Sequence, residues 1–536
     1  MPILRGSGFW RFLQFASVGL ATVLMVPVLP AEQPIAVAPA TLPRIGTVSE
    51  RYQSYNIEML EVTGGRFWAP YKQAGTAPAP APAAAKPGMP AGMDPSLFRY
   101  RKPIDLSNLR LRKLAAALGP AYVRVSGTWA NSTYFQDSDA PAPTTPPAGF
   151  GGVLTRQEWR GVVDFSHAVG AEIITSFAIS PGVRDASGVW TPVEAAKFLA
   201  YTKSVGGRIA GAEMFNEPTI AAMGGAPKGY DAAAYGRDFR AFRAFVKKDA
   251  PDMLILGPGS VGEAAPPHAE MPGMHLIRSE DMLKAEGPGL DVFTYHFYGA
   301  VSQRCGRMGA ATQTSEDAAL SADWLNRTDR DEAFYAALRD HFEPGKPMWL
   351  TETAEAACGG NPWAADFIDS FRFLNQLGSL AKRGVQVVMH NTLAASDYSL
   401  IDEATLNPRP NYWAALLWRR LMGTTVLDAG ASAAPNLYLY AHCLRGHPGG
   451  VALLAINADS AATRGLEIPA GSERYTLAAQ DLLGTRVDLN GVELKMAAGD
   501  ALPKIAGQPA QAGSISVAPR TITFLAIPNA RNASCQ

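Results

Sequence analysis

The chain has 536 residues, of which 47% are hydrophobic and 18% are charged, so it can bury a large core and is not intrinsically disordered. Its 48 Lys and Arg residues balance its 48 Asp and Glu residues. Without a net charge, no overall field draws the protein to nucleic acid or to an anionic membrane. We therefore expect no nucleic-acid partner, and an anionic substrate would have to be recognised locally.

The N-terminus has the pattern of an export signal. Arg5 and Arg11 precede the apolar run at 13–29, which is followed by small and polar residues around Ala31. Residues 1–31 are therefore predicted to be a signal peptide, and the protein to be periplasmic or secreted. The run is close to the minimum length of a membrane span, so an uncleaved anchor, and with it membrane contact, stays open. Residues 32–50 could add an edge strand to a later β domain.

Residues 51–422 alternate between short β-rich segments and helical ones, which predicts a (β/α)8 TIM barrel. One helix is marked by Asn361 as N-cap, Pro362 at its first position and Gly384 beyond its end. The Pro- and Ala-rich stretches 76–93 and 137–150 are predicted to be surface loops. The eight expected strands are 52–59, 121–127, 171–180, 211–218, 253–259, 291–299, 347–354 and 385–393.

After residue 422 the helical period is lost. Residues 423–536 contain short strands joined by turns, among them a hairpin turn at Asn490 and Gly491. This pattern is typical of a β-sandwich. The fold class is thus an α/β barrel with a C-terminal β-sandwich domain.

Two carboxylates fall at the ends of expected strands. Glu217 lies between Asn216 and Pro218, and because a residue before proline is restricted, we expect Glu217 to be extended at the tip of the fourth strand. Glu352 lies at the tip of the seventh. Either acid alone is more often solvated or salt-bridged. When they face each other across one barrel mouth, the two acids fit a retaining glycosidase, whose two carboxyl groups are about 5–5.5 Å apart. Asn216, next to Glu217, could bind a sugar hydroxyl.

Several longer motifs point in the same direction. They are LRKLAAALGPAYVRVSGT (111–128), FNEP (215–218), YHFYG (295–299), LTETAEAACGG (350–360), HNTLAASDYSLID (390–402), NPRPNYWAALLWRRLMG (407–423) and LNGVELKM (489–496). Through them the sequence resembles glycoside hydrolase family 79, the heparanases and heparanase-like β-glucuronidases. The resemblance implies that Glu217 is the acid/base and that Glu352 is the nucleophile.

The resemblance also implies residues that bind substrate. Glu58 matches an acid that binds hydroxyls of the non-reducing sugar. Tyr298 matches a tyrosine beside the nucleophile, and Tyr398 matches a tyrosine that holds a uronate carboxylate. Gly127 and Thr128 fall in a loop that borders the site. His296 and Asn391 are further candidates, although His296 could equally be an aromatic at the edge of the core and Asn391 could serve only to satisfy backbone groups.

The sequence departs from the family beside Tyr398. Relatives have Arg-Gln and then Gly-Gly-Asn, where this chain has His390-Asn391 and then Ala395-Ser396-Asp397. If a glycine there adopts a positive φ, Ala or Ser would strain the backbone. Asp397 would also place a negative charge near a uronate. A glycosidase of the same clan with a neutral-sugar specificity therefore stays open.

The four cysteines are even in number and show no metal-binding spacing, so we expect disulfides, no metal and no cofactor. Cys305 and Cys358 follow neighbouring strands and could pair, with two free thiols as the alternative. Cys443 and Cys535 would tie the C-terminal tail to its own domain, and the resemblance implies the same pair.

The favoured interpretation is a metal-independent retaining β-glycosidase, a β-glucuronidase of heparanase type that acts on glucuronate-containing glycans or glycosides. A non-catalytic carbohydrate-binding protein is the rival from another class. The pair Glu217 and Glu352 argues against it, because binding alone does not need two opposed carboxylates.

Overall fold

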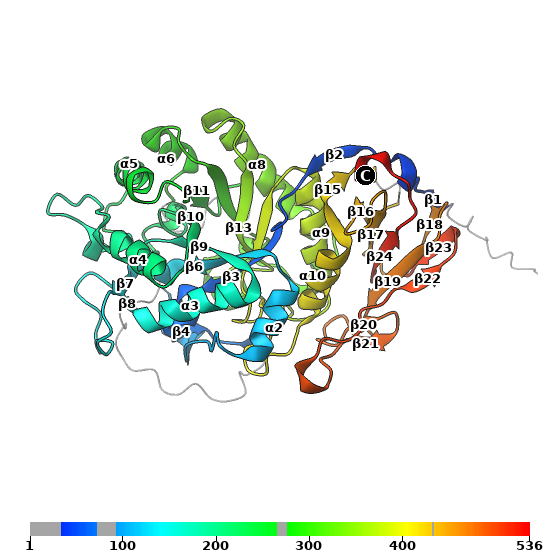
Figure 1. Ribbon diagram of the computed structural model, residues 1–536, viewed down its shortest axis with the longest axis horizontal. Coiled ribbons are helices and arrows are strands. Elements are labelled where there is room, and N and C mark those ends of the chain that lie inside the picture. The colour runs from blue at the N-terminus through cyan, green and yellow to red at the C-terminus, as the bar shows by residue number, and fades with distance from the viewer. Residues whose placement is uncertain (1–33, 72–92, 265–275, 431–433) are drawn as a thin grey trace, which may run out of the picture. The chain divides into compact units, whose positions relative to one another are not determined.

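The computed structural model describes residues 34–71, 93–264, 276–430 and 434–536. Eight parallel strands close into a barrel in chain order, with β14 paired to β3. Helices surround the strands (Figure 1). The predicted TIM barrel is confirmed. Its strands are β3 (Gln53–Glu58), β6 (Ala121–Ser126), β9 (Ala171–Ser176), β10 (Ile209–Glu213), β11 (Leu254–Ser260), β12 (Val292–Tyr298), β13 (Met348–Ala354) and β14 (Val387–His390).

The helices follow the apolar periodicity of the sequence. In α3, for example, Thr155 and Glu158 form a capping box, Trp159 and Val162 are buried, and Gly170 ends the helix in the left-handed conformation. The helices are α1 (Met59–Thr63), α2 (Leu109–Ala117), α3 (Arg156–Val169), α4 (Val193–Ser204), α5 (Ala232–Asp249), α6 (Ser279–Glu286), α7 (Ala322–Leu325), α8 (Arg327–Phe342), α9 (Asp369–Lys382) and α10 (Pro410–Leu421).

Helix α9 begins seven residues later than the sequence predicted, at Asp369 instead of Pro362. Asn361 does not cap it, because its side chain is used elsewhere: Oδ1 accepts from Gln303 N, and Nδ2 donates to Glu355. The backbone N–H groups of Phe367 and Ile368 donate to carbonyls at 482–484 instead of starting a helix. Gly384 follows the end of the helix with φ +83°, as expected.

Small sheets border the barrel. Strand β4 (Gly65–Trp68) pairs antiparallel with β5 (Phe98–Arg101), and β7 (Thr133–Gln136) pairs parallel with β8 (Gly152–Thr155). Between β7 and β8, residues 137–150 form a largely exposed loop. Of the other Pro- and Ala-rich stretch, 76–92 lies outside the described residues.

The C-terminal part is a sandwich of two sheets whose facing side chains share one core. Leu439, Leu453 and Leu525 of the larger sheet pack with Leu466 and Ile515 of the smaller. The larger sheet contains β2 (Arg44–Thr47), β15 (Met422–Leu427), β16 (Leu437–Leu444), β17 (Val451–Asn457), β24 (Thr521–Ile527), β19 (Ser472–Ala478), β20 (Asp488–Leu489), β21 (Val492–Glu493) and β22 (Gln508–Ala510). The smaller contains β1 (Ile35–Ala36), β18 (Arg464–Ile468) and β23 (Gly513–Val517).

The outer face of the larger sheet packs against α9, so that helix is buried along almost its whole length. Tyr440 of β16 donates a hydrogen bond to Asn375 Oδ1 at 2.7 Å. A Cβ added at Gly378 would lie 2.3 Å from the ring of Tyr440. This close approach fixes the sandwich against the helix that lies between β13 and β14.

Both predicted disulfides are present. Cys305–Cys358 joins the segments that follow β12 and β13, and Cys443–Cys535 joins β16 to the C-terminal tail. Within the described residues, no helix is long and apolar enough to cross a membrane. The apolar run at 13–29 lies outside the described residues.

Candidate active site

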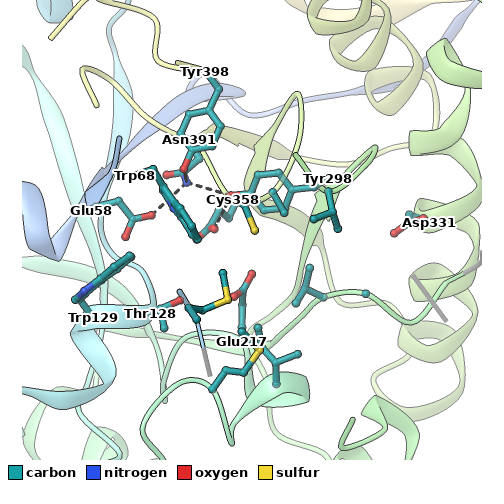
Figure 2. A pocket seen from close by; sticks show the side chains of 18 residues that line it. Glu58, Trp68, Thr128, Trp129, Glu217, Tyr298, Asp331, Cys358, Asn391 and Tyr398 are labelled. Carbon is teal, nitrogen blue, oxygen red and sulfur yellow. Dashed lines mark hydrogen bonds between the residues drawn. The ribbon is translucent and has the colours of Figure 1, made fainter. Parts of the chain in front are cut away.

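A cavity of about 140 Å³ opens at the C-terminal ends of the barrel strands. Both proposed catalytic acids, Glu217 and Glu352, line it. So do five of the residues expected to bind substrate, which are Glu58, Thr128, Tyr298, Asn391 and Tyr398. Glu217 is labelled in Figure 2. The strands that carry these residues are far apart in the sequence, and barrel closure brings them to one place.

Glu217 is not extended, contrary to the expectation from Pro218. Strand β10 ends at Glu213, and Glu217 has φ 50° and ψ 63°, in the left-handed region. Asn131 holds the backbone just before it: Asn216 N donates to Asn131 Oδ1 at 2.8 Å, and Asn131 Nδ2 donates to Asn216 O at 2.9 Å. A non-glycine residue in this region costs about 1–3 kcal/mol, so the surrounding contacts must fix it.

Glu352 is held at both oxygens. Arg124 Nη1 donates to Oε2 at 2.8 Å, and the Tyr298 hydroxyl donates to Oε1 at 2.7 Å. Asn391 Nδ2 in turn donates to the Tyr298 oxygen at 3.0 Å, which directs the tyrosine proton towards Glu352. The carboxylate is thus fixed in orientation at the edge of the cavity.

Arg124 connects Glu352 to a second buried acid, Glu213. Its Nη2 donates to Glu213 Oε2 at 2.8 Å and to Asn216 Oδ1 at 2.7 Å. Thr294 and Thr351 donate to the other oxygen of Glu213. Burial would raise the pKa of Glu213, but Arg124, His296 and Thr351 together outweigh burial and lower that pKa. Glu213 is therefore a permanent anion that holds the arginine in place.

His296 lies behind the two acids and is completely buried. Burial alone would lower its pKa, but Glu352, Glu213 and Glu217 outweigh burial and raise the pKa to about 9. Its Nδ1 lies 3.1 Å from Glu217 Oε1 and donates to it when the ring is charged. Nε2 also lies 3.3 Å from Arg124 Nη2, whose two protons are already directed to Glu213 and Asn216, so that contact is not a hydrogen bond.

The two acids are close enough to act on one bond. A carboxylate oxygen of Glu217 and one of Glu352 lie within 4.8 Å of each other. Burial, together with the charge of Glu352, raises the pKa of Glu217 in spite of the hydrogen bond with His296. Such a shift keeps a carboxyl group protonated for use as a general acid.

Glu217, His296 and Glu352 also present ligand atoms close enough together to hold a metal ion. Each oxygen of Glu352 already accepts a hydrogen bond, one of them from the guanidinium of Arg124. A cation bound there would face that guanidinium at short range. The hydrogen bonds from Arg124 and Tyr298 therefore suit Glu352 as a reactive carboxylate better than as a metal ligand.

Glu58, Asn391 and Tyr398 form the polar side of the cavity. Asn391 Nδ2 also lies 3.2 Å from Glu58 Oε1 and 3.2 Å from the Tyr398 oxygen, so its two protons are shared among three acceptors. The Tyr398 proton is left available for a substrate. Among the described residues, Glu58 Oε2 has no hydrogen-bond partner, and burial, aided by the charge of Glu352, raises the pKa of Glu58.

Gly127 makes room for Glu58. It has φ +96°, and a Cβ at this position would lie 1.6 Å from Glu58 Oε2. Both the backbone conformation and the space require glycine. Gly127, Asn216 and His296 thus support the cavity from behind, whereas the sequence suggested that they would touch substrate.

The segment that departs from the family is accommodated by its own contacts. Ser396 adopts φ 69°, and its hydroxyl donates to Gly359 O at 2.8 Å. Asp397 Oδ2 accepts from Arg304 Nη2 at 2.8 Å and from Tyr71 N at 3.0 Å. The charge that we expected near a uronate is therefore paired with Arg304.

Four residues of the site were not singled out from the sequence. Arg124 and Glu213 were detectable, because each is a charged residue within an otherwise apolar barrel strand. Trp68 and Trp129 line the cavity beside Glu58, and both come from segments with no strong motif (Figure 2). Phe67 and Phe98 pack behind them in a small aromatic cluster.

Similar proteins carry glycosidase names. Heparanase-like protein 1 of Arabidopsis thaliana is 28% identical over 66% of this chain and 65% of that relative, just under two thirds of its length. Heparanase of Mus musculus is 28% identical over 80% of this chain and 88% of that protein. Hyaluronoglucuronidase of Hirudo nipponia is 25% identical over 81% of this chain and 92% of that protein.

A solved structure shares the fold. The 4-O-α-L-rhamnosyl-β-D-glucuronidase of Fusarium oxysporum 12S superposes with a TM-score of 0.59 at 12% identity, over 92% of this chain and 100% of that one. The sequence model described as glycosyl hydrolase family 79, N-terminal domain, matches residues 102–378, just over half of the chain. With this match over more than half of its length, the chain belongs to glycosyl hydrolase family 79.

Proposed function

We propose that this glycoside hydrolase is an exported, retaining β-glucuronidase that cleaves glucuronate-containing glycans or glycosides by double displacement. The observation that carries the proposal is the pair Glu217 and Glu352, with carboxylate oxygens within 4.8 Å of each other in one cavity. This close approach supports direct attack by one acid, because the two carboxyl groups of retaining enzymes lie closer together than those of inverting enzymes.

In the first step Glu352 attacks the anomeric carbon, and Glu217 gives its proton to the leaving oxygen as the glycosidic bond breaks. In the second step water gives a proton to Glu217 and attacks the glycosyl ester, which releases Glu352. Because the charge of Glu352 helps to raise the pKa of Glu217, that pKa falls once Glu352 is esterified. The same residue can therefore act first as acid and then as base.

Arg124 and Tyr298 prepare Glu352 for both steps. Their hydrogen bonds orient the attacking oxygen and stabilise the carboxylate when it leaves in the second step. Trp68 and Trp129 offer flat apolar faces beside Glu58, of the kind that stack against a sugar ring.

The preference for a uronate rests on Tyr398. Its oxygen accepts from Asn391, so its proton can be donated to a carboxylate. The pairing of Asp397 with Arg304 removes one argument for a neutral sugar. The name of the leech relative, hyaluronoglucuronidase, agrees with a glucuronidase.

Two assays test the proposal. Matched p-nitrophenyl β-glucuronide and β-glucoside should differ strongly in kcat/KM, in favour of the glucuronide, and a preference for the glucoside would move the assignment to a neutral sugar. In an NMR time course the first-formed product should be the β-anomer. An α-anomer formed first would rule out double displacement.

A further inference from the structure

The cavity continues past Glu217 into a second half with a different chemical character. This half is built from segments that follow β10, β11 and β12, together with α8. We call it the leaving-group subsite, and it consists of Ile220, Met223, Val261, Val301 and Asp331. Four of the five side chains are aliphatic or thioether groups, and Asp331 is the exception.

The position of the acid decides which half receives the leaving group. Glu217 must reach the glycosidic oxygen, and Ile220 and Met223 follow it directly in the chain. The groups suited to sugar hydroxyls, Glu58 and Asn391, come from β3 and the end of β14 on the other side of the barrel. The leaving group therefore lies against the apolar half.

Asp331 is a carboxyl group without a partner. Its residue is 6% exposed, and within the described part of the chain it makes no hydrogen bond and no ion pair. Figure 2 shows its carboxyl end directed towards the other cavity side chains. Burial raises its pKa to about 7. A buried polar group that faces an open cavity is stabilised if a ligand supplies the missing hydrogen bond.

Within the described part of the chain, the ionisable side chains that line the cavity are all acids, so any charge that they carry is negative. Among the described residues that line it there are four acids, Glu58, Glu217, Asp331 and Glu352, and no Lys, Arg or His. The half that contains Tyr398 still offers a hydroxyl proton to an anion. The leaving-group subsite offers no side-chain donor of that kind, so a sulfate or carboxylate placed there would lose water without compensation.

We propose that the leaving-group subsite accepts an uncharged aglycone that has an apolar face and a hydroxyl group bound by Asp331, and that it rejects sulfated or carboxylated leaving groups. The inference rests on the proposed function in one respect, namely that Glu217 is the acid. Asp331 is then a residue that determines which leaving groups the enzyme accepts.

Three phenyl β-glycosides test the inference. They carry –CH2OH, –CH3 or –CH2SO3⁻ at the same ring position, where the methylene keeps the acidity of the three phenols similar. The wild-type enzyme should prefer the hydroxymethyl substrate to the methyl one, and should turn over the sulfomethyl substrate with a kcat/KM about tenfold lower than the methyl one.

Asp331→Asn removes the charge at nearly constant size. It should raise kcat/KM for the sulfomethyl substrate several-fold relative to kcat/KM for the methyl substrate. Asp340→Asn is the matched control, because Asp340 lies on the same helix but is exposed and paired with Arg339 at 2.7 Å. Met223→Lys, at a half-buried position that tolerates a long side chain, should also favour the sulfomethyl substrate.

Equal wild-type rates for the methyl and sulfomethyl substrates would overturn the inference. So would an unchanged ratio of the two rates in both Asp331→Asn and Met223→Lys. The series is run on the sugar that the enzyme hydrolyses fastest. If that sugar is glucose, the uronate proposal fails while the leaving-group subsite is still tested.

Discussion

Arg124 Nη1 lies 2.8 Å from Glu352 Oε2, and through this contact a strand on one side of the barrel holds the proposed nucleophile on the other. The same guanidinium is bound to Glu213, which has no exposed surface. The site is therefore built on a buried ion network, and Glu352, the proposed nucleophile, is its most exposed member. Networks of this kind fix geometry, but they leave a buried charge unpaired when one member is removed.

Arg124→Lys keeps the charge but cannot reach Glu352, Glu213 and Asn216 together, because a lysine ammonium lacks the planar fork of a guanidinium. We expect kcat to fall by about 10²–10³-fold, as for loss of a preorganised donor. Steady-state kinetics measure this, with thermal melting to show that the variant is folded at the assay temperature. A folded variant with wild-type kcat would mean that Glu352 does not depend on Arg124.

Tyr398→Phe removes the proton that we assign to the uronate carboxylate. The KM for a glucuronide should rise much more than the KM for a glucoside. The difference between the two effects should correspond to about 1.5–3 kcal/mol of binding free energy, the contribution of one charge-assisted hydrogen bond. Tyr298→Phe is the matched control, since Tyr298 donates to Glu352 and its loss should lower kcat for both sugars alike. Equal effects of Tyr398→Phe on the two substrates would make Tyr398 structural.

Gly127→Ala places a methyl group where Glu58 Oε2 now lies. We expect a severe loss of kcat/KM, because Glu58 must leave the cavity wall. Gly188→Ala is the control for backbone strain: Gly188 has φ +79°, and a Cβ there meets nothing within 4 Å. If both variants lose stability equally and keep activity, the contact between Gly127 and Glu58 has no role in the site.

His296 should link stability to pH. Its pKa is raised from 6.5 to about 9, so its charged form stabilises the fold fully below pH 6.5, and this contribution is lost as pH rises through 9. The free energy of unfolding of wild type relative to His296→Gln should therefore shrink between pH 6.5 and 9. Urea denaturation across this range measures it, and a difference that does not vary with pH would argue against a charged His296.

The sequence was most informative where periodicity and turn residues act locally. All eight barrel strands were predicted, because each is a short apolar run between turn signals. Asn361 and Pro362 resembled a helix start, but tertiary contacts bind the Asn361 side chain and delay α9 to Asp369. Local preference was overruled there by packing.

The site was predicted less completely, for a related reason. Glu217 and Glu352 were found from their positions at the ends of strands, yet the left-handed backbone of Glu217 depends on Asn131, which is distant in sequence. The pairing of Asp397 with Arg304 likewise joins two loops that only the folded barrel brings together. Such long-range pairings leave no periodic pattern in a single sequence.

The most direct test of the account is to trap the glycosyl enzyme and locate the bond. A 2-deoxy-2-fluoro-β-glucuronosyl fluoride should react in the first step and hydrolyse slowly in the second, because the fluorine destabilises both oxocarbenium-like transition states. Peptide mass spectrometry should then find one sugar, attached to Glu352. A label on Glu217, or an enzyme that turns over the reagent with no labelled peptide at any time, would contradict the assignment.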